Sequence, residues 1–167
     1  MDEPIIQSIK IENENRKVQN QLDAKKATEK IIADALYGVL ATQNNTHPYT
    51  SLMAYGYSSN LKNIVFTTPR TTRKHKFLGE CSNVAFQVDN RPKKIKSIMS
   101  IESLTAIGSA YEINSQKKEY DKLTQLLLYK HYYLKDFLSS PSTALYCINV
   151  SHFFHVVRLQ EVSIITP

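Results

Sequence analysis

The sequence contains few cysteines and no long apolar segment. Only Cys81 and Cys147 occur in its 167 residues, and they form no CxxC pair. This spacing argues against a zinc site and against the disulfide framework of small secreted domains, so we expect no bound metal and two reduced, buried thiols. There is also no basic-then-apolar leader and no apolar run long enough to cross a bilayer. We therefore expect a cytoplasmic protein that does not enter a membrane.

Internal repeats, low-complexity tracts and domain linkers are absent as well. A chain of this length buries roughly two-thirds of its unfolded surface as one domain. The first 20 or so residues are polar, and the segment 12–15 interrupts any regular pattern. We predict a polar N-terminal arm, 1–22, that is a mobile segment or a frayed helix, followed by a single domain, 23–167.

Acidic residues are in the minority, with 15 Asp and Glu against 21 Lys and Arg and a formal charge of +6. The cations gather in two clusters, at 70–76 and at 91–96. Neither cluster carries the interleaved aromatic residues that stack bases in single-strand binders, so we expect no nucleic-acid partner. Such clusters are usually solvated faces or loops, and we keep that interpretation for the second one.

Strand patterns dominate the chain after a helix that we expect from Asp23. The predicted strands are 37–43, 49–57, 64–68, 83–88, 104–113, 144–150 and 153–165. Gly108 predicts a bend or bulge, and a second helix is expected at about 71–79. A third helix, capped by Ser115, is expected to continue after a kink through 130–138. Sequential strands with short loops predict a mainly β fold with flanking helices, in which an antiparallel sheet closes into a barrel.

The most informative segment joins the strand 64–68 to the helix that follows it. The strand ends in two threonine hydroxyls, breaks at Pro69, and restarts as a helix whose first turn carries hydroxyls and cations. Free N–H groups at the helix start, threonine hydroxyls and Arg and Lys side chains can converge on one anion there. The segment therefore predicts a phosphate site, with a solvated basic turn as the alternative.

The order of these motifs resembles the FMN-binding split-barrel family, the relatives of pyridoxamine 5'-phosphate oxidase. The matching pieces are Gly38–Thr42, a turn ending in Pro48, a second strand, Val65–Thr68 and Thr72–Lys74. They follow one another in the family's order and spacing, and the strand 146–150 with its successor resembles the family's closing strands. The resemblance implies an antiparallel split β-barrel that binds FMN.

Carried over to this sequence, the resemblance implies that Thr67, Thr68, Thr72 and Lys74 hold the flavin phosphate. Arg70 and Arg73 are further candidates that the sequence does not separate. The second strand would run along the flavin ring, with Ser51 where the oxidase has a phosphate-binding arginine. The complete set of predicted cofactor-binding residues is Tyr49, Thr50, Ser51, Leu52, Phe66, Thr67, Thr68, Arg70, Thr72, Arg73 and Lys74.

The family resemblance also implies a homodimer with the flavin at the subunit interface, and an FMN-dependent oxidoreductase with a small-molecule electron donor and acceptor. The C-terminal segment 156–167 lacks the arginine-and-histidine motif with which the oxidase recognises its pyridoxal substrate. We therefore do not expect vitamin B6 oxidation. In shape the chain is nearer to short flavoproteins such as nitroimidazole-resistance-like reductases.

An alternative is a non-catalytic module that binds flavin, haem or another anionic ligand, or one whose basic patches contact nucleic acid. His131 is a candidate haem contact, although an aromatic helix end packed on the barrel explains it as well. His152 and His155 would lie on opposite faces of a strand and so would not share a metal. Tyr49 and Tyr55 either shield the flavin ring or pack in the core. We find no general acid and base pair.

Overall fold

The computed structural model describes residues 14–44, 46–91, 98–158 and 161–167. Residues 1–13 of the predicted arm and 92–96 of the second cationic cluster lie outside the described residues. The described elements are α1 (Glu14–Asp34), β1 (Tyr37–Gln43), β2 (Pro48–Ala54), β3 (Gly56–Tyr57), β4 (Asn63–Pro69), α2 (Arg73–Glu80), β5 (Asn83–Asp89), η1 (Ile98–Ser100), β6 (Glu102–Glu112), α3 (Glu119–Lys130), η2 (Tyr132–Leu134), α4 (Lys135–Leu138), β7 (Thr143–Val157) and β8 (Glu161–Ile165).

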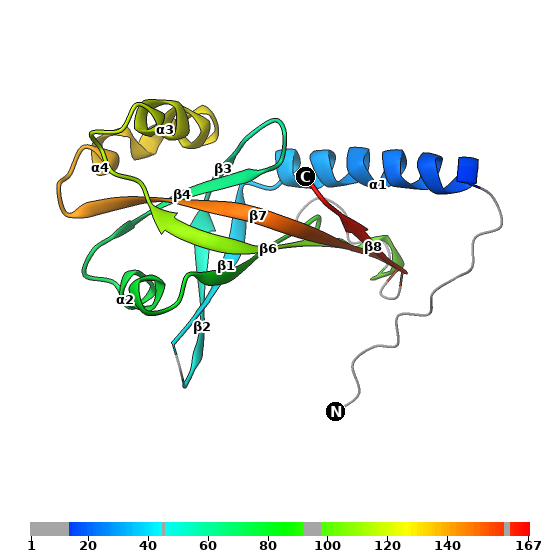
Figure 1. The fold of residues 1–167 in the computed structure, drawn as a ribbon, viewed down its shortest axis with the longest axis horizontal. Helices are drawn as coiled ribbons and strands as arrows, with labels where there is room; N and C mark the ends of the chain where they lie inside the picture. The colour runs from blue at the N-terminus through cyan, green and yellow to red at the C-terminus, as the bar shows by residue number, and fades with distance from the viewer. Residues whose placement is uncertain (1–13, 45, 92–97, 159–160) are drawn as a thin grey trace.

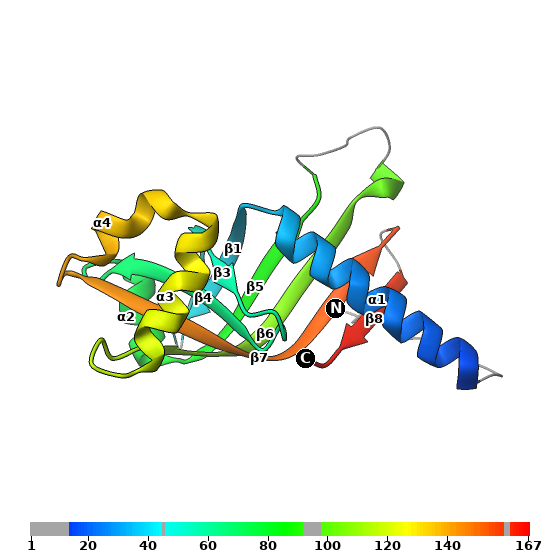
Figure 2. The ribbon, with the colours of Figure 1, turned by 90° about the horizontal axis from the view of Figure 1, so that it is seen from above.

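The strands form one antiparallel sheet in the order β2-β1-β5-β6-β7-β4-β3, and β8 pairs with β7 beyond the end of β4. The sheet curls into a half barrel with helices at its flanks (Figure 1). In Figure 2, α1 crosses the sheet beside β8, while α3 and α4 lie at the other end. The predicted fold class, a mainly antiparallel split barrel with flanking helices, is confirmed.

The inner face of the curled sheet carries the main core. Leu40, Phe86, Ala106, Phe153 and Ile165 are direct cross-strand partners, and all of them are buried. Ile31 and Ile32 of α1 and Leu78 of α2 pack into the same cluster. A second cluster lies on the other side of β4 and β7, under α3. Consequently α2 and α3 pack on opposite faces of β4.

The last turn of α1 is closed by two side chains from distant parts of the chain. Tyr55 donates its hydroxyl hydrogen bond to the carbonyls of Ile32 and Ala35, at 2.7 and 2.9 Å. The Lys130 ammonium donates to the same two carbonyls, at 2.9 and 2.6 Å. Carbonyls at a helix C-terminus have no partner within the helix, so these contacts anchor α1 to the barrel and to α3.

Several predicted boundaries are wrong for reasons of tertiary structure. The strand expected at 49–57 is split into β2 and β3, because β2 pairs with β1 up to Ala54, whereas Gly56 and Tyr57 pair with β4. The two strands expected at 144–150 and 153–165 are instead the continuous β7 and the short β8. No side chain caps α3, which begins at Glu119 rather than near Ser115. Helix α1 begins at Glu14 and so includes part of the predicted arm.

The predicted irregularity at Gly108 is confirmed, because the register of β6 against β7 shifts between Ile107 and Gly108. A Cβ at Gly108 would collide with the carbonyl oxygen of Asn149, so the two backbones approach too closely for any side chain. The glycine is therefore required by packing at the bulge.

We predict that Gly108→Ala lowers the free energy of unfolding by about 1–3 kcal/mol or more, as overpacking does. Gly79→Ala is the matched control, because a Cβ at Gly79 in α2 meets nothing within 4 Å. It is expected to be neutral or to stabilise by about 0.5–1 kcal/mol. Urea denaturation measures both; equal effects would contradict the assigned bulge.

Candidate functional site

The predicted phosphate segment folds as a strand, a tight turn and a helix. Strand β4 ends at Pro69, and α2 begins at Arg73 with Thr72 as its N-cap. The Thr72 hydroxyl accepts a hydrogen bond from the His75 N–H at 3.3 Å, as an N-cap side chain does. Within the described residues, the N–H groups of Arg73 and Lys74 make no hydrogen bond. Two free donors therefore remain at the start of α2.

The three predicted hydroxyls already donate to other groups of the protein. Thr67 donates to the Ala144 carbonyl at 3.0 Å, and Thr72 donates to the Pro69 carbonyl at 2.8 Å. The Thr68 and Thr72 oxygens lie 3.0 Å apart, and because the Thr72 proton is used, Thr68 is the donor. These hydroxyls hold the turn in shape. The strongest free donors of the segment are its cations and backbone N–H groups.

Lys74 is the most unusual cation of the segment. Its side chain is half-buried on α2, and burial lowers the pKa of its ammonium. Among the described residues it has no carboxylate or hydrogen-bond partner. A partly desolvated ammonium without a counter-charge is unfavourable in the free protein, and an anion would relieve that cost.

Arg70 and Arg73 have different surroundings. Arg70 donates to the Glu112 carboxylate at 2.6 Å and to the Pro141 carbonyl at 3.3 Å, so it turns away toward β6 and β7. The Arg70 guanidinium holds the pKa of Glu112 below its usual range. The Arg73 guanidinium lies over the ring of Tyr49, 5.4 Å from its centre. Arg73 is thus the arginine that faces β2.

The predicted residues of β2 divide between the two faces of the sheet. Ser51 pairs directly with the buried Leu40, so Ser51 and Tyr49 belong to the inner face, where Tyr49 contacts Phe77 of α2. Thr50 and Leu52 point outward, and Leu52 is 72% exposed. The structure thus brings Tyr49 and Ser51 to the same side as Arg73.

Two of the predicted aromatic contacts lie in the core. Phe66 is fully buried and stacks on Tyr146 with ring centres 5.5 Å apart, so its side chain does not face a ligand. Tyr55 is also fully buried. Burial raises the pKa of its hydroxyl well above the usual range.

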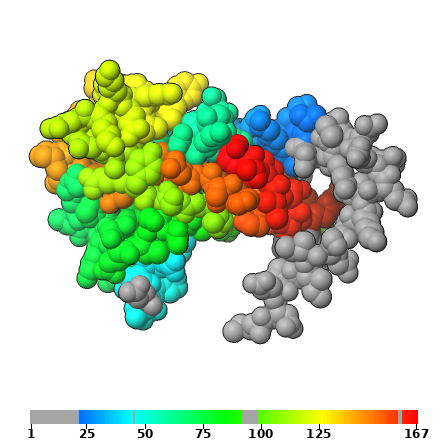
Figure 3. Space-filling model, in the orientation of Figure 1, coloured from blue at the N-terminus to red at the C-terminus, as the bar shows by residue number. Residues whose placement is uncertain are grey.

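The outer face of the sheet carries a row of cross-strand partners that none of the described helices covers. The row, which we call the outer row, consists of Leu52, Val39, Gln87, Thr105, Phe154 and Ile164. Leu52 and Ile164 are 72% and 50% exposed. Figure 3 shows β6, β7 and β8 open at this surface. Exposed apolar surface across several strands is typical of a face that another protein covers.

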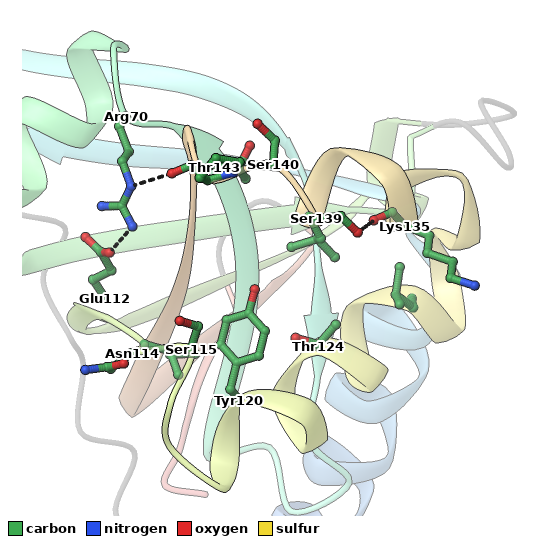
Figure 4. A pocket seen from close by; sticks show the side chains of 14 residues that line it. Arg70, Glu112, Asn114, Ser115, Tyr120, Thr124, Lys135, Ser139, Ser140 and Thr143 are labelled. Atoms are coloured by element: carbon green, nitrogen blue, oxygen red, sulfur yellow. Dashed lines mark hydrogen bonds and ion pairs between the residues drawn. The ribbon is translucent and has the colours of Figure 1, made fainter.

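A pocket of about 810 Å³ lies between the end of β6, the start of β7 and the helices α3 and α4 (Figure 4). Of the predicted site residues, only Arg70 lines it. Sequence reasoning missed this pocket, because its lining comes from segments that are far apart in the chain, from Arg70 to Thr143.

Within the described residues, the histidines and cysteines form no metal site. His152 is exposed and His155 is buried on β7, where His155 lies 3.0 Å from the Glu102 carboxylate. His131 is buried with its Nδ1 2.9 Å from the Tyr133 hydroxyl, as expected for a packed helix end. Cys147 is buried, whereas Cys81 is only half-buried.

In the part of the chain that the structure describes, no group of three or more potential metal ligands is present. Over the same residues, no helix has the length and apolar character needed to span a membrane.

Sequence comparisons place the chain in no family: no family model matches it, and no curated protein matches it significantly. Solved structures do match in fold. A haem-binding protein from Mycobacterium smegmatis superposes with a TM-score of 0.76 at 16% identity, covering 86% of this chain. The chain spans only 57% of that protein's length.

Two further similar structures are a flavin-binding protein and a member of an oxidase family. A FAD-binding protein from Mesorhizobium loti has a TM-score of 0.63 and 15% identity, covering 79% of this chain and 92% of its own. A pyridoxine phosphate oxidase family protein from Clostridium acetobutylicum has a TM-score of 0.64 and 11% identity, covering 84% of this chain and 92% of its own. At these identities the likeness shows the fold, which is the split barrel that the sequence resembled.

Proposed function

We propose that this protein is an FMN-binding flavoprotein that holds the flavin phosphate at the start of α2. The single observation that carries the proposal is Lys74, a half-buried ammonium with a lowered pKa and no partner among the described residues. The free N–H groups of Arg73 and Lys74 lie at the same helix start. A phosphate there would receive charge-assisted hydrogen bonds from both kinds of donor.

The flavin ring is proposed to lie along the inner side of β2. The Arg73 guanidinium lies over the ring of Tyr49 on that strand, whereas Arg70 pairs with Glu112. These contacts support Arg73 rather than Arg70 as the replacement for the phosphate-binding arginine that the oxidase has at the position of Ser51. Leu52 and Thr50 point to the other face and would contact the flavin only through their backbone groups or from a second copy.

An oxidoreductase activity fits this arrangement without a catalytic side chain. A flavin carries the electrons itself, while the protein supplies binding and orientation. The fold is shared with a FAD-binding protein and with a pyridoxine phosphate oxidase family protein, which supports a flavin. Vitamin B6 oxidation is not part of the proposal, because residues 156–167 carry no arginine-and-histidine motif.

A haem module is the second candidate, since a haem-binding protein shares the fold. His131 carries an unpartnered Nε2 within the described residues, but the side chain is only 1% exposed and its other ring nitrogen contacts Tyr133. The absorption spectrum separates the two, because flavin and haem absorb at different wavelengths. A protein that takes up haem but not FMN would overturn the flavin proposal.

We further propose that two copies associate through the outer row, so that the partner reaches around the free edge of β2 to the flavin on the inner side of that strand. The row crosses β2, β1, β5, β6, β7 and β8, so it offers a broad apolar surface for a second copy. Leu52 lies at the end of the row next to Ser51, which would bring the partner close to the inner side of β2.

We predict that Lys74→Ala weakens FMN binding by about 1–3 kcal/mol, since a charge-assisted hydrogen bond is lost. Titration with FMN, followed by the quenching of flavin fluorescence, measures the dissociation constant. Circular dichroism should show an intact fold, because the variant removes a charge that has no partner among the described residues.

Lys76→Ala is the matched control for this variant. Lys76 lies on the same helix, but its side chain is 76% exposed and sits 4.0 Å from Glu80. It should change FMN affinity only slightly, as a screened surface charge does. Equal losses in the two variants would mean that net charge, rather than a contact at Lys74, governs binding.

We predict that Leu52→Glu converts a dimer into monomers and lowers FMN affinity. Tyr129→Glu is the control, because Tyr129 is 92% exposed on α3 and lies outside the outer row. Sedimentation velocity measures the assembly. A monomeric parent protein, or a Leu52→Glu variant that stays dimeric, would refute an interface on the outer row.

A further inference from the structure

One carboxylate contacts the chain on both sides of the proposed phosphate site. Glu112, the last residue of β6, accepts a hydrogen bond from the Arg70 guanidinium at 2.6 Å on Oε1. Its other oxygen, Oε2, lies 3.6 Å from Nε2 of His75. Arg70 precedes the helix start, and His75 follows it in the first turn of α2. The segment between them, 71–74, contains the Lys74 ammonium and the free N–H groups that we assign to the phosphate.

The Arg70 end of this bridge is firmly held. The Arg70 N–H donates to the Ser142 carbonyl at 2.9 Å, and its Nε donates to the Pro141 carbonyl at 3.3 Å. Figure 4 shows the guanidinium directed toward Glu112, with the ion pair drawn as a dashed line. Arg70 therefore joins the turn before α2 to the end of β6 and to the loop before β7.

The His75 end of the bridge is incomplete while the imidazole is neutral. Its Nε2 is buried and makes no hydrogen bond within the described residues, and 3.6 Å to Glu112 is too long for one. The ring packs edge-on against Tyr146 of β7, with ring centres 5.9 Å apart. Burial raises the pKa of the Tyr146 hydroxyl to about 12, so this neighbour is neutral. A protonated His75 would gain an ion pair with Glu112.

The charges around His75 determine what its protonation does. Glu112 faces it from β6 and Arg70 is the other partner of that carboxylate, while Lys74 and Lys76 are its neighbours on α2. The Arg70 guanidinium holds the pKa of Glu112 below its usual range, so the carboxylate stays charged in mild acid. A cation in the first turn of a helix is unfavourable by itself, because the helix dipole is positive there. Glu112 offsets that cost and draws the first turn of α2 toward the point that holds Arg70.

We propose that Glu112 is a positioning residue for the flavin phosphate. It holds Arg70 and His75 on either side of the helix start and so fixes the free N–H groups between them. Protonation of His75 completes the bridge, so the contribution of Glu112 to phosphate binding increases as the pH falls. Glu112 acts through these two residues and does not itself contact the phosphate, since two anions repel each other. This inference rests on the proposed function, because it concerns the same site.

Glu112→Gln tests the proposal, because simple electrostatics predicts the opposite sign. Removal of a carboxylate near an anion site should strengthen FMN binding, whereas loss of the positioning contact should weaken it by about threefold to tenfold in mild acid. Glu80→Gln is the matched control, since it makes the same change of charge at the other end of α2. The side chains of Glu112 and Glu80 are 35% and 39% exposed. The control should leave FMN affinity nearly unchanged, and tighter or unchanged binding in Glu112→Gln would overturn the proposal.

Riboflavin, which lacks the phosphate, separates positioning from a general structural defect. Its affinity should be the same in Glu112→Gln and in the parent protein, because only the phosphate uses the helix start. Equal losses for FMN and riboflavin would contradict the positioning role. A parent protein that binds FMN no more tightly than riboflavin would instead refute the phosphate site itself, and this inference with it.

The pH profile tests the role of His75. Histidine side chains gain a proton between about pH 8 and pH 5, so the loss caused by Glu112→Gln should grow by about threefold from pH 8 to pH 6. In a His75→Gln background, the loss should be the same at both pH values. The phosphate of FMN also takes up a proton at about pH 6, but that change is common to all variants. A loss that does not grow in the parent background, or that grows equally without His75, would contradict the bridge.

Discussion

The backbone pairing of β7 determines where every proposed site lies. One edge of this 15-residue strand pairs with β6, while the other edge pairs first with β4 and then with β8. The β4 pairing sets the position of Thr67 and Thr68 before the turn into α2. The β6 pairing brings Glu112 to Arg70, and the β8 pairing extends the outer row. A shift of one residue would reverse the faces of all these side chains.

This arrangement separates the charges of the turn into two groups with different roles. Glu112 neutralises Arg70 on the side of α3, and this ion pair forms one end of the pocket. Arg73 and Lys74 have no such carboxylate within the described residues and remain available at the start of α2. Burial of the Lys74 ammonium without a counter-charge costs free energy in the protein that has no ligand bound. An anion that pairs with the ammonium removes this cost and therefore binds more tightly. The same turn therefore supplies Arg70 to the ion pair with Glu112 and Arg73 and Lys74 to the proposed binding site.

Local patterns predicted much of this fold. Most strand positions along the chain, the hairpin of β1 and β2, the helix start near Thr72 and the irregularity at Gly108 follow from turn residues and hydrophobic alternation in short windows. The break at Tyr55 does not, because it depends on the change of strand partner from β1 to β4, which no local pattern encodes. Likewise, the sequence could not separate Arg70 from Arg73, since the partner of Arg70 lies 42 residues away on β6. The pocket and the outer row depend on register across several strands, which no single segment encodes.

The most direct test of the central claim is the pKa of the Lys74 side chain, measured by NMR of selectively labelled lysines with and without FMN. We predict that in the free protein Lys74 loses its proton at a lower pH than a lysine ordinarily does, because burial disfavours its charged form. With FMN bound, the pKa should rise, since a phosphate stabilises the ammonium. A Lys74 pKa at the ordinary lysine value that FMN leaves unchanged would contradict this claim.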